Sequence, residues 1–384
     1  MLKSYAFTNP TKIVFGNSEI NRLPQLMREL GGTRPLIVTD PGIAATGLLE
    51  KICLILENAG LPALTYDRVH ADPDTQNIEE IHETAEAGKC DLIIGVGGGS
   101  SLDAAKGVSL LGTNQGRLQD FGGLNKVKKK GLPLIAIPTT AGTGSEVTSF
   151  IVLSDLEAGI KFTISSDLIV PDIALLDPEI TLTLPPKMTA ATGFDALTHA
   201  IEGYTSLSGE PISDALNLEA VRLIARALPI AVNSGSNIEA RCDMLQGALL
   251  AGMGFHNSFL GLCHAMASPL GATFHAPHGI VNAVMLPYVM EYNYIACPEK
   301  FAVLAAALGT EARGADIYEK AHCAVDAVKK LLDLCHMPQS IREIKGRKEN
   351  LDAVARDAML SIQLRHNPRT AKQEDVRNLL EAAY

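Results

Sequence analysis

Length, composition and charge already limit the kind of protein that this chain can be. It has 384 residues, of which 47% are hydrophobic and 20% charged, enough apolar material for two folded domains and too much for extensive disorder. The net charge of −10 argues against a nucleic-acid partner, because binding phosphates requires a basic surface. The one short basic run, 126–130, is expected to be a solvated loop.

Cysteine usage and hydropathy indicate the compartment. The seven cysteines are scattered and form no CxxC pair, which is typical of reduced thiols. The first residues do not show a basic start followed by an apolar stretch, and no apolar run approaches the ~20 residues that span a bilayer. We therefore expect a cytoplasmic protein without a membrane partner.

In chain order, the first half alternates short apolar runs with helical patterns. Continuous apolar runs predict buried strands at 34–40, 91–95, 132–138 and 173–176, and a helical pattern covers 48–58. Runs of this kind between helices are typical of parallel strands covered on both faces. The sequence therefore predicts an α/β domain at 1–186 with a Rossmann-like, doubly wound parallel sheet.

After Pro186 the strand signal disappears. Helical periodicity follows at 188–204, 212–232, 238–255, 261–274 and 279–292. The sequence thus predicts an all-helical domain at 187–384. Because clefts between domains are favoured ligand sites, we expect the active site in the cleft between the two domains.

A glycine-rich turn follows the second predicted strand. Gly97, Gly98 and Gly99 lead into Ser100 and Asp103 at the start of a predicted helix. Glycines allow the backbone to approach a pyrophosphate, and a helix N-terminus offers free N–H groups. The spacing is not GxGxxG, and such turns also occur for steric reasons, so this motif leaves phosphate binding open.

A second polar loop follows the third predicted strand. It holds four hydroxyls and two glycines, and the hydroxyls belong to Thr139, Thr140, Thr143 and Ser145. Such a loop can donate to phosphate or ribose oxygens, although it could also be a polar turn with capping hydroxyls. Because both loops leave the carboxyl ends of parallel strands, together they favour a dinucleotide. Asp40, at the end of the first strand, could accept from an adenosine ribose and would repel a 2′-phosphate, which favours NAD over NADP; otherwise it is an N-cap.

Metal-ligand residues gather in the second half. Asp195 and His199 are four residues apart and share one face of a helix, a spacing that suits either a metal ion or a buried Asp–His hydrogen bond. Further along, His264, His275 and His278 lie on or beside apolar helices. Burying several imidazoles and a carboxylate without a shared partner is costly, and a metal supplies that partner. The ligand types suit Fe²⁺, Zn²⁺, Mn²⁺ or Co²⁺.

Together these motifs resemble the iron-containing (group III) alcohol dehydrogenases. The similarity runs from residue 15 to 369 and is most specific at 95–106, 138–148, 193–204 and 261–279. The resemblance implies a dehydroquinate-synthase-like fold, reversible hydride transfer between an alcohol and NAD, and a homodimer or larger homo-oligomer. It implies Fe²⁺, with Zn²⁺ or Mn²⁺ as alternatives, held by Asp195, His199, His264 and His278.

The resemblance also assigns residues to the cofactor. This set includes Gly97, Ser100 and Asp103 of the glycine-rich turn and His278 at the metal end. Its other members are Asp40, Asp72, Gly98, Gly99, Thr139, Thr140, Thr143, Val152 and Lys161.

A departure from the family pattern at Ser268 concerns the proton route, and departures at His256 and Phe259 concern the substrate. Members usually carry a histidine four residues after the ligand that matches His264, and this chain has Ser268 there. Protons are therefore expected to leave near Ser268 and His278 through His275, ordered water or the cofactor ribose. The substrate is expected to be a small primary alcohol, with room for a polar or anionic tail, and to contact Phe150, Phe255, His256 and Phe259.

Two other classes of protein compete with this interpretation. A metal-dependent lyase of the dehydroquinate-synthase type would share the fold and use NAD. That type uses a Glu/His/His set and many basic residues, which do not match the Asp/His/His/His set here. A non-catalytic nucleotide- or metal-binding protein would not need four ligands beside two phosphate-type loops.

Overall fold

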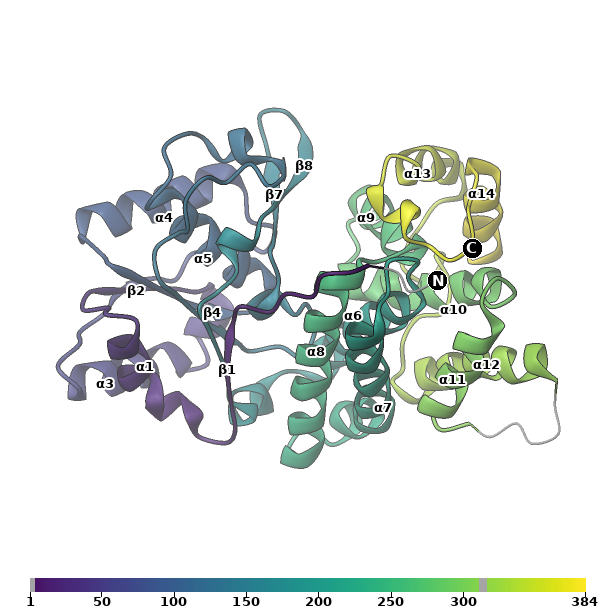
Figure 1. Cartoon of the computed structure of the whole chain (residues 1–384), viewed down its shortest axis with the longest axis horizontal. Coiled ribbons are helices and arrows are strands. Elements are labelled where there is room, and N and C mark those ends of the chain that lie inside the picture. Colours follow the sequence, from purple (N-terminus) through teal and green to yellow (C-terminus); the bar gives the residue numbers. More distant parts are fainter. Residues whose placement is uncertain (1–3, 311–315) are drawn as a thin grey trace. The chain divides into compact units, whose positions relative to one another are not determined.

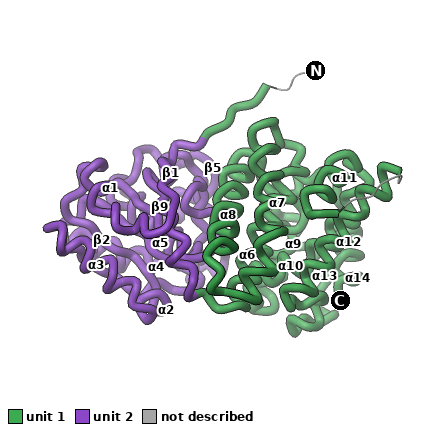
Figure 2. Tube along the Cα trace, turned by 90° about the horizontal axis from the view of Figure 1, so that it is seen from below, with its two compact units in different colours: residues 1–8, 141–143, 184–384 green, residues 9–140, 144–183 purple. Residues whose placement is uncertain are grey.

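The computed structural model describes residues 4–310 and 316–384 and divides into two compact units (Figures 1 and 2). The first, called here the α/β unit, comprises residues 9–140 and 144–183. The second, the helical unit, comprises 1–8, 141–143 and 184–384.

The α/β unit is built on a six-stranded sheet whose strand pairs are all parallel. In spatial order the strands are β1 (Lys12–Phe15), β9 (Ile173–Leu176), β6 (Leu134–Pro138), β4 (Leu92–Gly97), β2 (Pro35–Val38) and β3 (Leu64–Tyr66). The helices are α1 (Leu23–Glu29), α2 (Pro41–Ala44), α3 (Leu48–Asn58), α4 (Thr75–Ala87) and α5 (Gly99–Leu111).

Alternating side chains of the central strands pack into two separate cores. Leu36 and Ile93 point into a cluster shared with α4 and α5. Their neighbours Ile37 and Ile94 point into a second cluster, shared with α1 and α3. Each face of the sheet is thus covered by a pair of helices, which is why these strands read as unbroken apolar runs. The predicted α/β fold with a parallel sheet is confirmed.

The sequence prediction missed a second sheet. This sheet is three-stranded, in the order β5 (Gly123–Leu124), β8 (Ile160–Ser165) and β7 (Phe150–Asp155), and β7 pairs with β8 in antiparallel register. The antiparallel pair β7–β8 lies outside the segments that the sequence predicts as strands. The basic run 126–130 lies in a loop, as predicted.

In the part of the chain that the structure describes, the helical unit contains the five predicted helices, each within three residues of its expected ends, and four more beyond them (Figure 1). They are α6 (Pro186–Thr205), α7 (Pro211–Asn233), α8 (Ile238–Ser258), α9 (Leu262–Phe274), α10 (His278–Asn293), α11 (Pro298–Ala307), α12 (Ile317–Leu334), α13 (Leu351–Ala358) and α14 (Gln373–Ala382). Among the described residues, no helix combines the length and the apolar character that crossing a bilayer requires.

Candidate metal centre and dinucleotide site

Three helices of the helical unit bring the predicted metal ligands together. Asp195 and His199 lie one turn apart on α6, and His264 lies in the first turn of α9. All three are buried, and one ligand atom from each lies within 4.8 Å of the others. The i, i+4 spacing on α6 thus does place the carboxylate and the imidazole on one face.

The fourth predicted ligand, His278, is the first residue of α10. Its Nε2 lies 3.7 Å from Oδ1 of Asp195, and its ring centroid lies 5.3 Å from that of His264. Its side chain is half-exposed, whereas the other three are buried. The structure therefore gathers all four residues at one place, with one side open to solvent.

The protonation states of this cluster suit a divalent cation. Burial lowers the pKa of His199 to about 3, so that its imidazole is neutral, as a metal ligand must be. Burial works to raise the pKa of Asp195, but the neighbouring His199, His278 and His264 outweigh it, and the pKa lies below its usual value. Nδ1 of His199 is buried without a hydrogen-bond partner among the described residues, a cost that a bound ion or water would offset.

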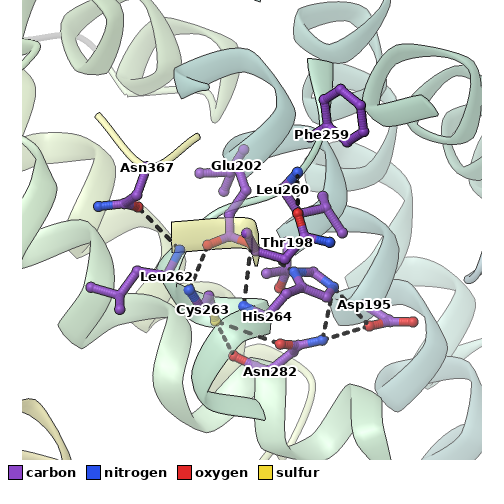
Figure 3. A network of polar contacts seen from close by, with 12 residues as sticks. Asp195, Thr198, Glu202, Phe259, Leu260, Leu262, Cys263, His264, Asn282 and Asn367 are labelled. Atoms are coloured by element: carbon purple, nitrogen blue, oxygen red, sulfur yellow. Dashed lines mark hydrogen bonds and ion pairs between the residues drawn. The ribbon is translucent and has the colours of Figure 1, made fainter. Parts of the chain in front are cut away.

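Two buried residues support these ligands and were missed by the sequence prediction. Glu202, on α6, accepts a 2.6 Å hydrogen bond from Nδ1 of His264. Asn282, on α10, donates from Nδ2 to Oδ1 of Asp195 at 2.7 Å, and the same nitrogen lies 3.2 Å from Nε2 of His264 (Figure 3). It also lies 3.1 Å from Nε2 of His278. A carboxylate behind a ligating histidine fixes its tautomer and its ring orientation. The signal was available, because Glu202 is seven residues from Asp195 and Asn282 four from His278 on the same helices.

In the α/β unit, the glycine-rich turn has the predicted strand–turn–helix geometry. It leaves β4, and Gly98 is the N-cap of α5. Gly97 has φ +150°, and a Cβ there would lie 2.5 Å from Oγ of Ser101, so a side chain would not fit. Asp40 caps α2 through Ile43 N–H, and it also accepts from the Ser101 hydroxyl at 2.9 Å. The N-cap interpretation of Asp40 is therefore seen in the structure, while its contact with a ribose stays a prediction.

The threonine loop lies against this turn. Thr139 N–H donates to the carbonyl of Gly97, and β6 and β4 are neighbours in the sheet. Oγ1 of Thr139 is buried without a hydrogen-bond partner among the described residues, and a Cβ on Gly98 would lie 3.5 Å from Oγ1 of Thr140. Both loops thus meet at the carboxyl ends of adjacent parallel strands, where ligands bind in open α/β sheets.

Further predicted cofactor residues join the same edge. Lys161 on β8 forms a 2.8 Å ion pair with Asp72, and Ser100 donates to the carbonyl of Ala71. Val152 N–H donates to Asp103 at 2.9 Å. These contacts lie within the α/β unit and link cofactor residues that the sequence predicts there. Thr143 and His278, by contrast, belong to the helical unit.

A buried group of charges lies directly behind the threonine loop. Asp103 accepts from the Ser145 hydroxyl at 2.6 Å, and its Oδ1 lies 3.7 Å from Nζ of Lys106. Lys106 is fully buried and donates to the carbonyl of Phe150 at 2.9 Å. Burial lowers the pKa of Lys106 to about 8 and raises the pKa of Glu146 to about 7. This group ties α5 to the loop and to β7.

The predicted substrate and proton-transfer residues are brought together only in part. Phe255 is buried and stacks on His199 with 4.4 Å between ring centroids, and His256 is buried beside it on α8. Phe259 ends α8 with φ 61° and ψ −178°, a backbone region that glycine almost alone adopts, and its ring stacks on His366. Phe150 belongs to the α/β unit.

Ser268 and His275 both lie on or next to the helix that carries His264. Ser268 is exposed one turn beyond His264, whose carbonyl accepts its hydroxyl at 3.4 Å. His275 is exposed and ends α9 in the left-handed region. The structure thus leaves both side chains open to solvent.

These observations define a class of protein. Its α/β unit carries loops at the carboxyl ends of parallel strands, as in dinucleotide sites, and its helical unit carries an Asp/His cluster suited to a metal. Comparison with known proteins then identifies the family. The "Iron-containing alcohol dehydrogenase" profile matches residues 10–178, and the "Fe-containing alcohol dehydrogenase family, C-terminal" profile matches 189–384.

Similar proteins agree over their full lengths. The chain is 37% identical to 1,3-propanediol dehydrogenase of Citrobacter freundii, covering 100% of this chain and 99% of that protein. A crystal structure of 1,3-propanediol oxidoreductase matches with TM-score 0.98 at 36% identity and full coverage of both chains. The sulfoacetaldehyde reductase of Bifidobacterium kashiwanohense in complex with NAD⁺ matches with TM-score 0.91 at 27% identity, covering 99% of each chain.

The chain belongs to the iron-containing alcohol dehydrogenase family, and the predicted resemblance is confirmed. It is an oxidoreductase, and NAD and a divalent metal are the cofactors that its family and its donor cluster support. The lyase of the dehydroquinate-synthase type does not fit these similarities.

Proposed function

We propose that this chain reversibly transfers hydride between a small primary alcohol and NAD at a single divalent metal, Fe²⁺ in the first instance. The observation that carries the proposal is the four-residue donor set Asp195, His199, His264 and His278, three of them buried with ligand atoms within 4.8 Å. In the α/β unit, the glycine-rich turn contacts Thr139, and Asp103 contacts Ser145 of the same threonine loop. The proposal places metal binding in residues 187–384 and dinucleotide binding in 1–186.

Each group of residues has a separate task in this reaction. Asp195 and the three histidines would hold the metal, which supplies Lewis acidity at the substrate oxygen. Gly97–Gly99 and the hydroxyls of Thr139 and Thr140 would bind the pyrophosphate through backbone and side-chain donors. Asp40 would accept from the adenosine ribose and repel a 2′-phosphate, which selects NAD. Phe255 shields His199 from water.

The substrate is proposed to carry a second polar or anionic group. Two of the similar enzymes named above act, by their names, on 1,3-propanediol and on sulfoacetaldehyde, and both of these molecules join a small primary alcohol or aldehyde carbon to a polar tail. His256 and the exposed His275 are the imidazoles proposed to accommodate such a tail, beside the apolar Phe150, Phe255 and Phe259.

The test is a screen of NADH oxidation by the Fe²⁺-loaded full chain. It compares 3-hydroxypropanal and sulfoacetaldehyde with butanal and decanal at equal concentration. Higher kcat/KM for the polar-tailed aldehydes supports the proposal, whereas a preference for decanal refutes the polar-tail assignment. A chain that oxidises NADH with none of these aldehydes would refute the reaction itself.

His275 is the proposed proton carrier in place of the family histidine, because it is exposed and lies on the segment between two ligand-bearing helices. Replacing it by alanine should remove one limb of the pH–rate profile. Ser268→His is the variant for comparison, because it restores the histidine that family members usually carry at this position. A His275→Ala enzyme with an unchanged pH–rate profile would show that protons leave by water or the ribose instead.

Location and assembly are part of the proposal. All seven cysteines are free, which supports a reducing compartment such as the cytoplasm. We propose a homodimer, as the family resemblance implies. Sedimentation equilibrium of the purified chain would give twice the monomer mass of 40.8 kDa if this is right and the monomer mass if it is wrong.

A further inference from the structure

The helix that carries His264 has no N-terminal cap of its own. The N-cap of α9 is Gly261, which has no side chain to accept hydrogen bonds. The first N–H groups of a helix have no partner within the helix and need acceptors from elsewhere. In α9 these N–H groups belong to Leu262, Cys263 and the ligand His264, and all three residues are buried away from water.

Two side chains distant in sequence supply these acceptors (Figure 3). Glu202 accepts from Cys263 N–H at 2.6 Å and from His264 N–H at 3.3 Å. Asn367, in the C-terminal segment, accepts from Leu262 N–H at 3.1 Å through Oδ1. Both side chains are buried, at 4% and 2% exposure. The start of α9 is thus capped jointly from α6 and from the chain's last forty residues.

The orientation of the Asn367 amide is fixed by its other contacts. Its Nδ2 donates to the carbonyl of Arg369 at 2.7 Å and to Oδ1 of Asn293 at 2.8 Å, while Nδ2 of Asn293 donates back to Oδ1 at 2.9 Å. The carbonyl of Arg369 can only accept, so the amide nitrogen must face it and the oxygen must face α9. All the hydrogen-bonding capacity of Asn367 is used.

The glycine at the N-cap fits this arrangement. A Cβ on Gly261 would lie 2.9 Å from Oδ1 of Asn367 and 3.0 Å from Oε1 of Glu202. Because both acceptors converge on this position, a capping side chain there would displace them. The start of α9 is therefore built for external capping by Glu202 and Asn367.

We propose that Asn367 is a positioning residue for the metal centre, an inference that rests on the proposed ligand role of His264. Asn367 holds the first turn of α9, and Glu202 holds both that turn and the His264 ring through Nδ1. Together they keep Nε2 of His264 facing Asp195, with 3.8 Å between Nε2 and Oδ1 of Asp195. Metal sites lose affinity when the groups that orient their ligands are removed. Asn367 would therefore set metal affinity from a position 103 residues beyond the ligand.

The test measures Co²⁺ affinity of the metal-free full chain by competition with a chromophoric chelator, without an activity assay. Asn367→Ala should raise the Co²⁺ dissociation constant about tenfold. It should also speed amide hydrogen exchange at Leu262, Cys263 and His264. Asn293→Ala, which loosens Asn367 without touching α9, should produce a smaller change in the same direction and serves if Asn367→Ala does not fold.

Asn114→Ala is the matched control, because Asn114 is another buried asparagine with several hydrogen bonds but lies in the α/β unit. It should leave the Co²⁺ dissociation constant unchanged. The inference is overturned if the folded Asn367→Ala chain binds Co²⁺ as tightly as the wild type, or if Asn114→Ala weakens binding equally. A wild-type chain that binds no Co²⁺ would overturn the proposed metal centre first, and this inference with it.

Discussion

At the scale of single residues, the metal cluster shows how far spacing alone can lead. The i, i+4 pair of Asp195 and His199 pointed to one helix face, and the structure brings both residues to His264. The spacing also places Glu202 on the same face, but spacing does not show its role, because that role depends on burial and on a hydrogen bond to His264, 62 residues away. Residue types and spacing therefore predict ligands better than they predict the groups that orient them.

Glu202 gives the first prediction at this scale. Glu202→Gln should raise the Co²⁺ dissociation constant roughly 10- to 100-fold, because an amide cannot stabilise His264 Nδ1–H and both N–H groups of α9 as a carboxylate does. Chelator competition measures the change. Glu210→Gln is the control, since Glu210 is a buried carboxylate that caps α7 and contacts no ligand. Equal affinities for Glu202→Gln and the wild type would contradict the assignment.

Glu146 gives a prediction about pH. Burial raises its folded-state pKa to about 7, above the unfolded value of 4.5, so its contribution to stability is complete below pH 4.5 and is lost as pH rises to 7. Glu146→Gln removes this loss. The stability of the variant relative to the wild type should therefore improve between pH 5 and pH 8, by on the order of 3 kcal/mol. Urea unfolding at both values tests this, and an identical difference at the two pH values would contradict it.

At the scale of elements, the strands and helices whose side chains face a buried core are the ones that the sequence predicts. The central strands and helices α6 to α10 were predicted because their apolar residues face a core on a regular period. The β7–β8 hairpin was missed because apolar side chains also occupy its exposed face: Val152 is 47% exposed and Ile160 57%. These residues hide the alternation by which a half-buried strand is recognised. Edge strands β1 and β3 are short and each has only one buried residue, so they lack the continuous buried run by which β2 and β9, which are equally short, are recognised.

The joining of α5 to β7 by Lys106 can be tested through stability. Lys106→Met leaves Asp103 buried without its cation and removes the donor to the carbonyl of Phe150, at a cost of roughly 3–5 kcal/mol in unfolding free energy. Lys161→Met, which breaks an exposed ion pair with Asp72, should cost less than about 1 kcal/mol. Guanidinium unfolding of both variants compares them. Similar losses would show that Lys106 does not hold these elements together.

At the scale of the whole molecule, the proposed binding tasks are divided between the two units. All four proposed metal donors belong to the helical unit, and most of the residues proposed to bind the cofactor belong to the α/β unit. The sequence indicates a change of this kind, because β-branched strand runs stop before Pro186 and helical periodicity begins there. The domain boundaries 1–186 and 187–384 stay a prediction. The substrate was less accessible to prediction, since Phe150 and Phe255 lie in different units and no motif links them.

Separate binding tasks predict separable losses. Asp195→Asn should weaken Co²⁺ binding more than about 100-fold, since even groups behind the ligands contribute 10- to 100-fold. It should leave the NAD dissociation constant of the metal-free chain within about threefold of the wild type, because most of the proposed cofactor residues lie in the other unit and Asp195 is not among them. Calorimetric titration with each ligand checks both values. Loss of NAD binding together with metal binding would contradict the division of tasks.

The most direct test of the central claim is NADH formation when a small primary alcohol such as 1,3-propanediol is added with NAD to the full chain. Chelator-treated protein is compared with protein reloaded anaerobically with Fe²⁺, Zn²⁺ or Mn²⁺. A metal- and NAD-dependent dehydrogenase predicts NADH formation that appears on reloading and is absent from Asp195→Asn under the same conditions. NADH formation at equal rates in metal-free and reloaded protein, or in none of the samples, would contradict it.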